Sequence, residues 1–398
     1  MGECQLEAWI LAGLAPPLSS QEERPPDRED YEGHVTKSLQ ILRSLETGEK
    51  ISEDTAPSIL LLCSQHSSGE SAWSSGEHQQ VSRRLLAVLE EKVSSVAALL
   101  SQTGGKLFKA LLCHLQPSLE TFTRQPGSVR SLVWLAEQLE EPQQVEVVVP
   151  LVLPHLLRWL DCWLPHFKLE GCQLARHIAA HSNPSHLIFY GRAELLTEPL
   201  TRLMSSTEAS VVRAAGQPLL ALTSIRHRDD LPASPGQADT LLASVISSLE
   251  VCSERERRTV YWDLLSHTVN LLGVGAARWV SVLTGLAISQ LDLSPPSPPA
   301  SVFSTLSQLA FLVPDCVARE ISPLLAAMFK YIYRVTSGEA RGEQGEMLSD
   351  LSDVTECLQQ VARCDIDTAR LLCVGLQQTS VNKTFDTVTL SVITNLNI

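Results

Sequence analysis

Apolar side chains recur every three or four residues along most of the chain. Between Arg84 and Leu100 they fall at Leu85, Leu86, Leu89, Val93, Val96, Ala97 and Leu100. This spacing places them on one stripe of a helix, and it returns in 302–313 and 321–332. We predict amphipathic helices over these stretches and over 35–45, 106–116, 130–139, 147–163, 168–181, 193–204, 207–225, 238–250, 255–272, 277–291, 346–362 and 366–376.

Signals for β-strands are few. The β-branched run 145–149 leads directly into the apolar stretch 151–160, which favours the start of a helix. The stretch 385–398 alternates Thr and Val, and its state is left open. Short turn-like breaks separate the helices, at 141–142, 182–184, 205–207, 228–236 and 337–345. This arrangement predicts an all-α fold, a HEAT/armadillo-like α-solenoid built from degenerate helical hairpins, because each hairpin leaves an apolar face that only its neighbour can cover.

The 398 residues exceed what one compact core usually holds. Pro, Ser and acidic residues mix in 16–32, and the run 294–299 is rich in proline, which lacks the donor that a helix needs. The run contains P-x-x-P, for which a stiff spacer is the favoured interpretation. The predicted organisation is a mostly disordered or loosely packed N-terminus at 1–34, an N-terminal helical region at 35–142, central repeats at 143–293, a connector at 294–300 and C-terminal repeats at 301–398.

The charge balance limits the classes of partner. The net charge is −14, from 31 basic and 45 acidic side chains, and no basic run appears. Binding to nucleic acid or to an anionic membrane usually requires a basic face, so we expect neither as a partner. The N-terminus has acids where a signal peptide has basic residues, and no apolar run reaches about 18 residues. The ten cysteines show no C-x-x-C pairs and lie mostly in apolar helices, which predicts a reducing, cytoplasmic and nuclear location.

No catalytic or cofactor-binding pattern is complete. Gly69-Glu70-Ser71 lacks the closing glycine of a nucleophile elbow, and Gly104-Gly105-Lys106 lacks the spacing of a phosphate-binding loop. Asp229-Asp230 is interpreted as a solvated pair. We therefore predict a non-enzymatic protein without cofactors.

A histidine-rich segment leaves a zinc site as a minor alternative. His177 and His181 stand four residues apart, which can place two ligands on one helix face. His155, His166 and His177 are spaced by about three helical turns. Yet Ile178 follows His177 where a zincin has Glu, and no second ligand pair exists, so hydrogen bonding between helices is favoured.

A series of residues between 152 and 178 resembles a known family. It comprises Val152-Leu153-Pro154, Asp161-Cys162-Trp163, Lys168, Gly171, Leu174, His177 and Ile178. Later steps in the same order are Tyr190-Gly191-Arg192-Ala193, Arg257-Arg258-Thr259, Tyr261, Leu272-Gly273 and Arg278. The series is similar to the Tel-two-interacting protein two family over about 145–376. Cys162 departs from it, since the family usually has a second acid there.

The resemblance implies a role and partners. Members of this family join Tel-two and Tel-two-interacting protein one in the Triple-T (TTT) complex, a co-chaperone of Hsp90 for the phosphatidylinositol-3-kinase-related kinases of growth and DNA-damage signalling. It implies direct binding to Tel-two-interacting protein one. An unrelated HEAT- or armadillo-type adaptor, such as a transport factor, is the alternative.

Eight positions are candidates for partner binding or for the shared motif: Asp161, Trp163, Lys168, Gly171, His177, Arg192, Arg258 and Tyr261. Gly171 lacks Cβ and would allow two helices to approach closely. Asp161 precedes a break at Pro165 and is expected to cap the following helix. Arg258 is expected to pair with a neighbouring helix or with the partner. Trp159 and Trp163 are four apart, so one helix face would hold both, with core packing favoured over a binding role.

Overall fold

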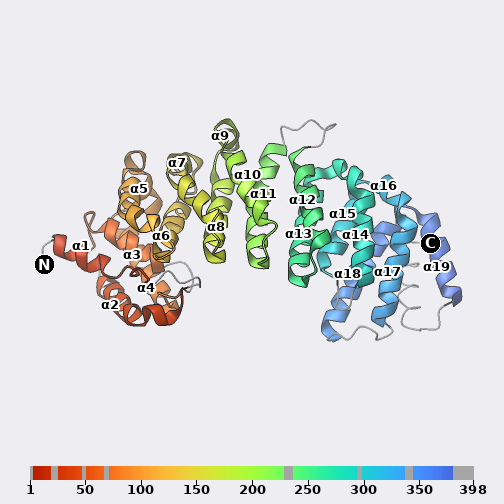
Figure 1. Cartoon of the computed structure of the whole chain (residues 1–398), viewed down its shortest axis with the longest axis horizontal. Helices are drawn as coiled ribbons and strands as arrows, with labels where there is room; N and C mark the ends of the chain where they lie inside the picture. Colours follow the sequence, from red (N-terminus) through yellow and green to blue (C-terminus); the bar gives the residue numbers. More distant parts are fainter. Residues whose placement is uncertain are drawn as a thin grey trace. The chain divides into compact units, whose positions relative to one another are not determined.

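The computed structural model describes residues 3–18, 26–46, 51–66, 71–227, 236–293, 298–336 and 344–379. In these residues the regular elements are all helices, and the only β-type pairing is an isolated bridge between Ser71 and Ser74 (Figure 1). The predicted all-α solenoid is thereby confirmed. The stretch 385–398, the pair Asp229-Asp230 and most of the connector at 294–300 lie outside the described residues.

The chain divides into two compact units, Met1–Leu222 and Thr223–Ile398. In the first unit α1, α3, α6 and α8 follow one another side by side, and α5, α7 and α10 form a second row; α2 and α4 pair beside α3. Helix α11 crosses the boundary between the units. The elements that begin in this unit are α1 Glu3–Leu11, η1 Arg28–Tyr31, α2 Glu32–Glu46, α3 Ala56–His66, α4 Gly76–Lys92, α5 Val96–Glu120, α6 Pro126–Glu137, α7 Pro142–Leu160, α8 Pro165–His181, α9 Pro184–Phe189, α10 Arg192–Leu203 and α11 Ala209–His227.

The second unit has the same two-row construction. Helices α12, α13, α15 and α18 are successive neighbours in one row, and α14, α17 and α19 are neighbours in the other. Its elements are α12 Gln237–Val251, α13 Arg255–Leu272, η2 Gly273–Trp279, α14 Val280–Leu293, α15 Ala300–Leu312, α16 Pro314–Arg319, α17 Ile321–Thr336, α18 Gln344–Ala362 and α19 Ile366–Thr379. The boundary between the units lies inside the predicted central region 143–293, within a helix, where no linker composition marks it.

Proline sets many of the helix starts. Five helices carry Pro at their first position, at 126, 142, 165, 184 and 314, where the missing N–H costs nothing. The interpretation of 145–149 as part of a helix is confirmed, since α7 begins at Pro142. The prediction of one continuous helix from Arg84 to Leu100 is wrong. Helix α4 ends at Lys92, and Ser95 caps α5 by accepting a hydrogen bond from the Ala98 N–H.

Helix α3 was not predicted, because it is buried around its whole circumference. Ten of its eleven residues are buried, including Ile59, Leu60 and Leu62. A helix that is covered on every side shows no amphipathic period. The N-terminus also differs from the expected loose segment 1–34. Helix α1 packs on α3, Ile10 is fully buried, and Tyr31 forms an edge-to-face contact with Trp73 at 5.8 Å.

Polar contacts between neighbouring helices reveal a repeat length that the sequence does not show. In the first unit the bonds Arg130–Glu170, Gln173–Glu137 and His177–Leu139 join residues 40, 36 and 38 positions apart. In the second unit Ser266–Ser304 and Lys330–Asp292 each join residues 38 apart. These separations of 36 to 40 residues lie just below or at the lower limit of the roughly 40–47 residues of a HEAT or armadillo repeat.

One segment is apolar enough by length and composition to cross a membrane, which corrects the expectation that none is. It spans Arg255–Asp292. In the structure it is not one helix, because Gly273, at φ 55°, ends α13 before η2 and α14. Trp262 and Leu265 of α13 and Leu283 of α14 are fully buried. These buried side chains belong to the core of the second unit, while 33% of the apolar window as a whole is buried.

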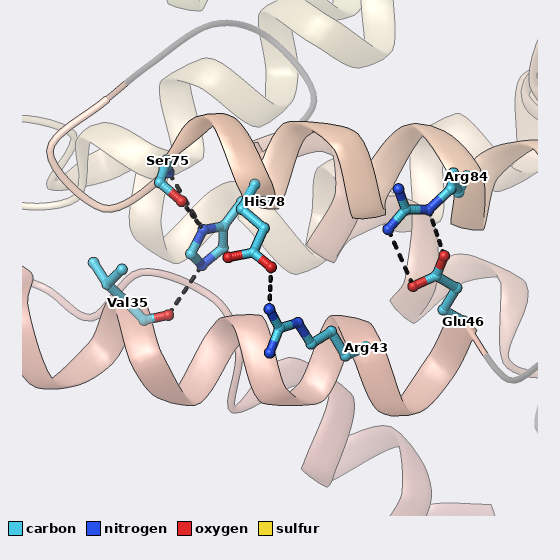
Figure 2. Close-up of polar contacts among 7 residues, drawn as sticks. Val35, Arg43, Glu46, Ser75, His78 and Arg84 are labelled. Carbon is cyan, nitrogen blue, oxygen red and sulfur yellow. Dashed lines mark hydrogen bonds and ion pairs between the residues drawn. The ribbon is translucent and has the colours of Figure 1, made fainter.

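Two stacked histidines are buried among α2, α3 and α4. His78 accepts the Ser75 backbone N–H at Nδ1, over 3.3 Å, so its neutral ring carries the proton on Nε2, 3.0 Å from the Val35 carbonyl oxygen (Figure 2). The His66 ring lies 4.9 Å from it and bonds Ser74 Oγ through Nδ1. Burial lowers the pKa of His66 to about 3 and also lowers the pKa of His78.

The solvent side of the same helix pair is held by ion pairs. Arg43 of α2 pairs with the Glu77 carboxylate of α4, and Figure 2 shows Arg84 of α4 on Glu46 of α2. Three of the four side chains are about half exposed and Glu46 is 30% exposed, so these pairs contribute little to stability. The stability of the α2–α4 pair therefore comes mainly from the buried side.

Acidification is expected to destabilise the first unit. In the unfolded chain His66 takes up a proton near its ordinary pKa of 6.5, whereas in the folded chain it stays neutral far below that pH. The stability is therefore complete above about pH 6.5 and is lost as the pH falls toward 3. Between pH 7 and 5, His66 alone accounts for about 2 kcal/mol of unfolding free energy. Urea denaturation at both pH values measures this loss.

The variant His66→Gln should reduce that pH-dependent loss by about the same 2 kcal/mol. The control His114→Gln changes an exposed histidine of α5 and should leave the loss unchanged. Equal pH dependence in the wild type and the His66 variant would contradict the assignment.

Gly171 of α8 lies directly against Leu160 at the end of α7. A Cβ at this position would lie 3.0 Å from Leu160 Cδ2 and 3.4 Å from the Leu160 backbone nitrogen. We expect Gly171→Val to lower the free energy of unfolding by about 1–3 kcal/mol through overpacking. Gly285, in the exposed middle of α14, has nothing within 4 Å of such a Cβ, so Gly285→Val should be neutral or slightly stabilising. Thermal unfolding of both variants tests the contact.

Candidate partner-binding surface

An exposed apolar surface lies where α9 ends and α10 begins. Ile188, Phe189 and Tyr190 are 41%, 80% and 56% exposed, and Leu195, one turn into α10, is 51% exposed. We call these four residues the α9–α10 patch; α9 and the start of α10 lie at the upper edge of Figure 1. Aromatic side chains grouped on a surface are typical of sites that bind other proteins.

The local sequence explains why this turn is exposed. Asn183 caps α9 by accepting the Ser185 N–H at 3.0 Å, and Pro184 begins the helix. Gly191 then adopts a left-handed conformation, with φ 65°, which residues with a Cβ rarely adopt. The chain leaves α9 there and enters α10. The last residues of α9 are therefore presented at a turn, where no following helical turn covers them.

An ion pair fixes the patch to α7. Arg192 Nη1 lies 2.7 Å from Glu146 Oε2, and both side chains are largely buried. His186 Nδ1 lies 3.5 Å from the other Glu146 oxygen. Glu146 thereby contacts one residue on each side of the turn. Because both ions of the Arg192–Glu146 pair are shielded from water, it holds the turn more firmly than an exposed pair would.

The aromatic rings of the patch are ordered by their neighbours. The Phe189 and Tyr190 rings meet edge to face, with centroids 5.1 Å apart. The Arg192 guanidinium carbon lies 4.7 Å from the Tyr190 centroid, within the range of a cation–π contact. Side chains that are already held in place lose little freedom when a partner binds. The arrangement is suited to binding and places no nucleophile or acid–base pair in the patch.

The structure assigns five of the eight candidate residues to contacts between helices. Gly171 faces Leu160, and Arg192 binds Glu146. His177 is buried, and its Nε2 donates to the Leu139 carbonyl oxygen at 2.9 Å. Tyr261 is 1% exposed, and burial raises the pKa of its hydroxyl.

Arg258 is the fifth of these candidates, and it joins three helices of the second unit. It donates to Gln290 Oε1 of α14 and to the carbonyl oxygens of Leu249 and Cys252 at the end of α12. A cation near these carbonyl oxygens also interacts favourably with the negative end of the helix dipole. Of the two expectations for Arg258, the structure shows the contact with neighbouring helices.

The remaining candidates are accessible. Trp163 is 59% exposed; it lies beyond the end of α7, so it does not share a helix face with the fully buried Trp159. Asp161 does not cap α8, whose N-cap residue is Leu164, and pairs instead with Arg202 of α10 at 2.7 Å. Lys168 is half-buried on the first turn of α8. Trp163 is at the opposite end of α7 from Glu146, so it is not part of the α9–α10 patch.

Two histidines of the histidine-rich segment form hydrogen bonds with the turn between α6 and α7. His177 and His181 stack at 4.6 Å, and each donates to a carbonyl oxygen of that turn, Leu139 and Glu140. His155 lies on α7 and His166 on α8, so they do not continue one helical series. Across the residues that the structure describes, no three His, Cys, Asp or Glu side chains are placed to hold a metal ion.

Tyr190 is among the residues that resemble the family, whereas Ile188 and Phe189 are not predicted from the sequence. The signal was present in the order of residues. A short apolar run that follows Asn183-Pro184 and ends at Gly191 is too brief to bury all its faces. Helical periodicity could not show this, because α9 has only six residues.

Comparison with known proteins supports the resemblance found in the sequence. No protein-family model matches the chain. The human TELO2-interacting protein 2 is 23% identical over 314 residues, which is 74% of this chain and 61% of the human protein. The chain thus spans less than two thirds of the length of this relative. The similarity confirms the resemblance to the Tel-two-interacting protein two family.

Solved structures share the fold at low identity. Kap95p, in a complex that concerns RanGDP, matches 99% of this chain and 48% of its own, with a TM-score of 0.56 and 11% identity. Kap121p matches 93% of this chain and 34% of its own, with a TM-score of 0.55 and 12% identity. At these identities the likeness shows the fold alone. This chain is accordingly a HEAT- and armadillo-like helical-repeat protein with distant similarity to TELO2-interacting protein 2.

Proposed function

We propose that this chain is a non-enzymatic scaffold subunit of a TTT-type co-chaperone complex. In this role it binds Tel-two-interacting protein one directly and Tel-two through the assembly. The complex would support the Hsp90-dependent maturation of phosphatidylinositol-3-kinase-related kinases, in the cytoplasm and the nucleus. The observation that carries the proposal is the similarity to TELO2-interacting protein 2 over 74% of this chain.

The fold and the α9–α10 patch support a binding role. The relative and the fold are of a scaffold type rather than an enzyme class. The patch lies between residues 188 and 195, inside the range 145–376 in which the sequence resembles the family. Phe189 is the most exposed aromatic of the first unit. We therefore assign the α9–α10 patch as the contact with Tel-two-interacting protein one.

The charge distribution fits this mode of binding. Arg192 and Glu146 neutralise one another beneath the patch, so that an apolar partner surface would not have to desolvate an unpaired ion. At the other end of α7, the surface around the exposed Asp161–Arg202 ion pair has Trp163 as the one exposed aromatic side chain among its described residues, so its apolar area is smaller. The patch is therefore preferred over the Trp163 end.

Affinity purification tests the complex itself. The tagged full-length chain, expressed in human cells, is expected to recover Tel-two-interacting protein one and Tel-two, identified by mass spectrometry. Recovery of neither protein, from a chain that elutes as folded monomer in size-exclusion chromatography, would refute the proposal.

A double substitution tests the patch. Phe189→Ala with Tyr190→Ala should weaken binding to purified Tel-two-interacting protein one at least tenfold, because exposed aromatic anchors carry much of an interface's binding energy. Both residues are exposed, so the thermal stability should change little. Trp163→Ala removes an exposed aromatic of the same unit outside the patch and should leave the affinity within about twofold. Isothermal titration calorimetry compares the three proteins; a larger effect of Trp163→Ala would contradict the assignment of the patch.

A further inference from the structure

The second unit contains an open groove between α15 and α18, with a volume of about 790 Å³. Helices α15 and α18 are neighbours in the same row. The bond from Cys364 Sγ to the Ala310 carbonyl oxygen joins the C-terminal ends of the two lining segments. The groove residues of α15 run from Ala300 to Phe311, and with a rise of about 1.5 Å per residue they extend over about 16 Å.

The floor of the groove is apolar, and an exposed aromatic side chain lies on one rim. Phe303, Ala310 and Cys357 are buried in the floor. Phe311 is 84% exposed, the most exposed aromatic side chain among the described residues of this unit. A single exposed apolar residue is ordinary on a protein surface, but Phe311 stands beside an apolar groove, which is the setting in which an exposed aromatic can take part in binding. The groove thus offers an apolar floor with one aromatic anchor.

Charge is divided along the groove. Asp353 and Glu356 of α18 are exposed at one end of it, and Arg363 is exposed toward the end where Phe311 lies. Among the described residues, no ion pair joins either acid to a basic side chain. Two adjacent carboxylates on an apolar groove favour a ligand that carries cations.

Two polar atoms at the groove have no partner among the described residues. They are Ser301 Oγ and Gln308 Oε1, both of which belong to residues that line it. The Gln308 side chain is half-buried, and its Nε2 reaches Ser304 Oγ at a long 3.4 Å. A weakly held amide can turn to accept a hydrogen bond from a bound backbone N–H. An extended peptide supplies such donors, whereas a helix has already used most of its own.

We propose that the α15–α18 groove binds a short extended segment of a partner protein, with Lys or Arg side chains toward Asp353 and Glu356 and an apolar side chain against Phe311. A groove of about 16 Å accommodates about five extended residues, at about 3.3 Å each. The site lies in the second unit and does not depend on the α9–α10 patch or on the proposed complex.

Fluorescence polarisation with defined peptides tests this site on the full chain. The probes are two labelled eight-residue peptides, one alternating Lys with Leu and the other alternating Glu with Leu. The Lys–Leu peptide is expected to bind at least tenfold more tightly. Phe311→Ser should reduce that affinity at least fivefold, and Asp353→Lys with Glu356→Lys should abolish the preference or reverse it.

Matched substitutions outside the groove serve as controls. Glu250→Lys and Val251→Ser change an exposed acid and an exposed apolar residue at the end of α12 and should leave the affinity unchanged. Thermal unfolding of every variant should match that of the wild type, since all the altered side chains are exposed.

Three outcomes would overturn the proposal. They are equal affinity for the two peptides, absence of binding to either, and an affinity that falls as much with the α12 substitutions as with those in the groove. A chain truncated after residue 379 tests whether the C-terminal segment of the same chain occupies the groove, by measuring peptide binding with and without that segment. If the truncated chain bound the Lys–Leu peptide and the full chain did not, the occupant would be the C-terminal segment of the same chain and the proposal would fail.

Discussion

The fold depends on the fact that each helix has an apolar face wider than its own hairpin can cover. Leu156 and Trp159 of α7 and Leu174 of α8 are fully buried because helices of the same and the neighbouring hairpin lie against them. Apolar burial is the main driving force but has no direction, so it does not by itself set how far one helix slides along the next. Polar bonds such as Arg130–Glu170 and Arg192–Glu146, between residues 40 and 46 positions apart, set that register in the first unit.

The same polar contacts complete the ends of helices, where backbone groups have no partner in the helix. Arg258 satisfies two carbonyl oxygens at the end of α12. Asp239 is almost fully buried at the start of α12, where it accepts the Gly236 N–H at 2.9 Å and the Trp279 indole N–H at 2.8 Å. A buried carboxylate with several donors is stable only while all of them stay in place. Helix ends and helix packing are therefore coupled in each repeat, and this explains why residues that resemble a family motif turn out to be structural.

The periodicity of apolar residues predicted the helices that have one solvent-exposed face. It did not predict helices that are buried on all sides or that are very short. The apolar spacing in 302–313 and 321–332 corresponds closely to α15 and α17. Helix α3 has no exposed stripe, and α9 has too few residues for a period to appear. The apparent stripe from Arg84 to Leu100 joined two helices, because the helix ends and restarts at a serine cap while the spacing of the apolar residues continues across the break. Periodicity records which side chains are buried, and it does not record whether the backbone between them is continuous.

For the candidate surface the sequence indicated a stretch of the chain but could not show which of its residues are buried and which are exposed. Gly171 and His177 belong to the motif, yet their environments are filled by Leu160 and by the Leu139 carbonyl oxygen, so a partner cannot reach them without displacing the fold. Phe189 is accessible because Gly191 turns the chain directly after it, a tertiary consequence of one left-handed residue. A motif in a helical repeat is thus a mixture of residues that hold the repeat together and residues that it presents. Burial separates the two groups: the Arg192–Glu146 pair is shielded and orients the turn, and the aromatic side chains above it remain available for contact.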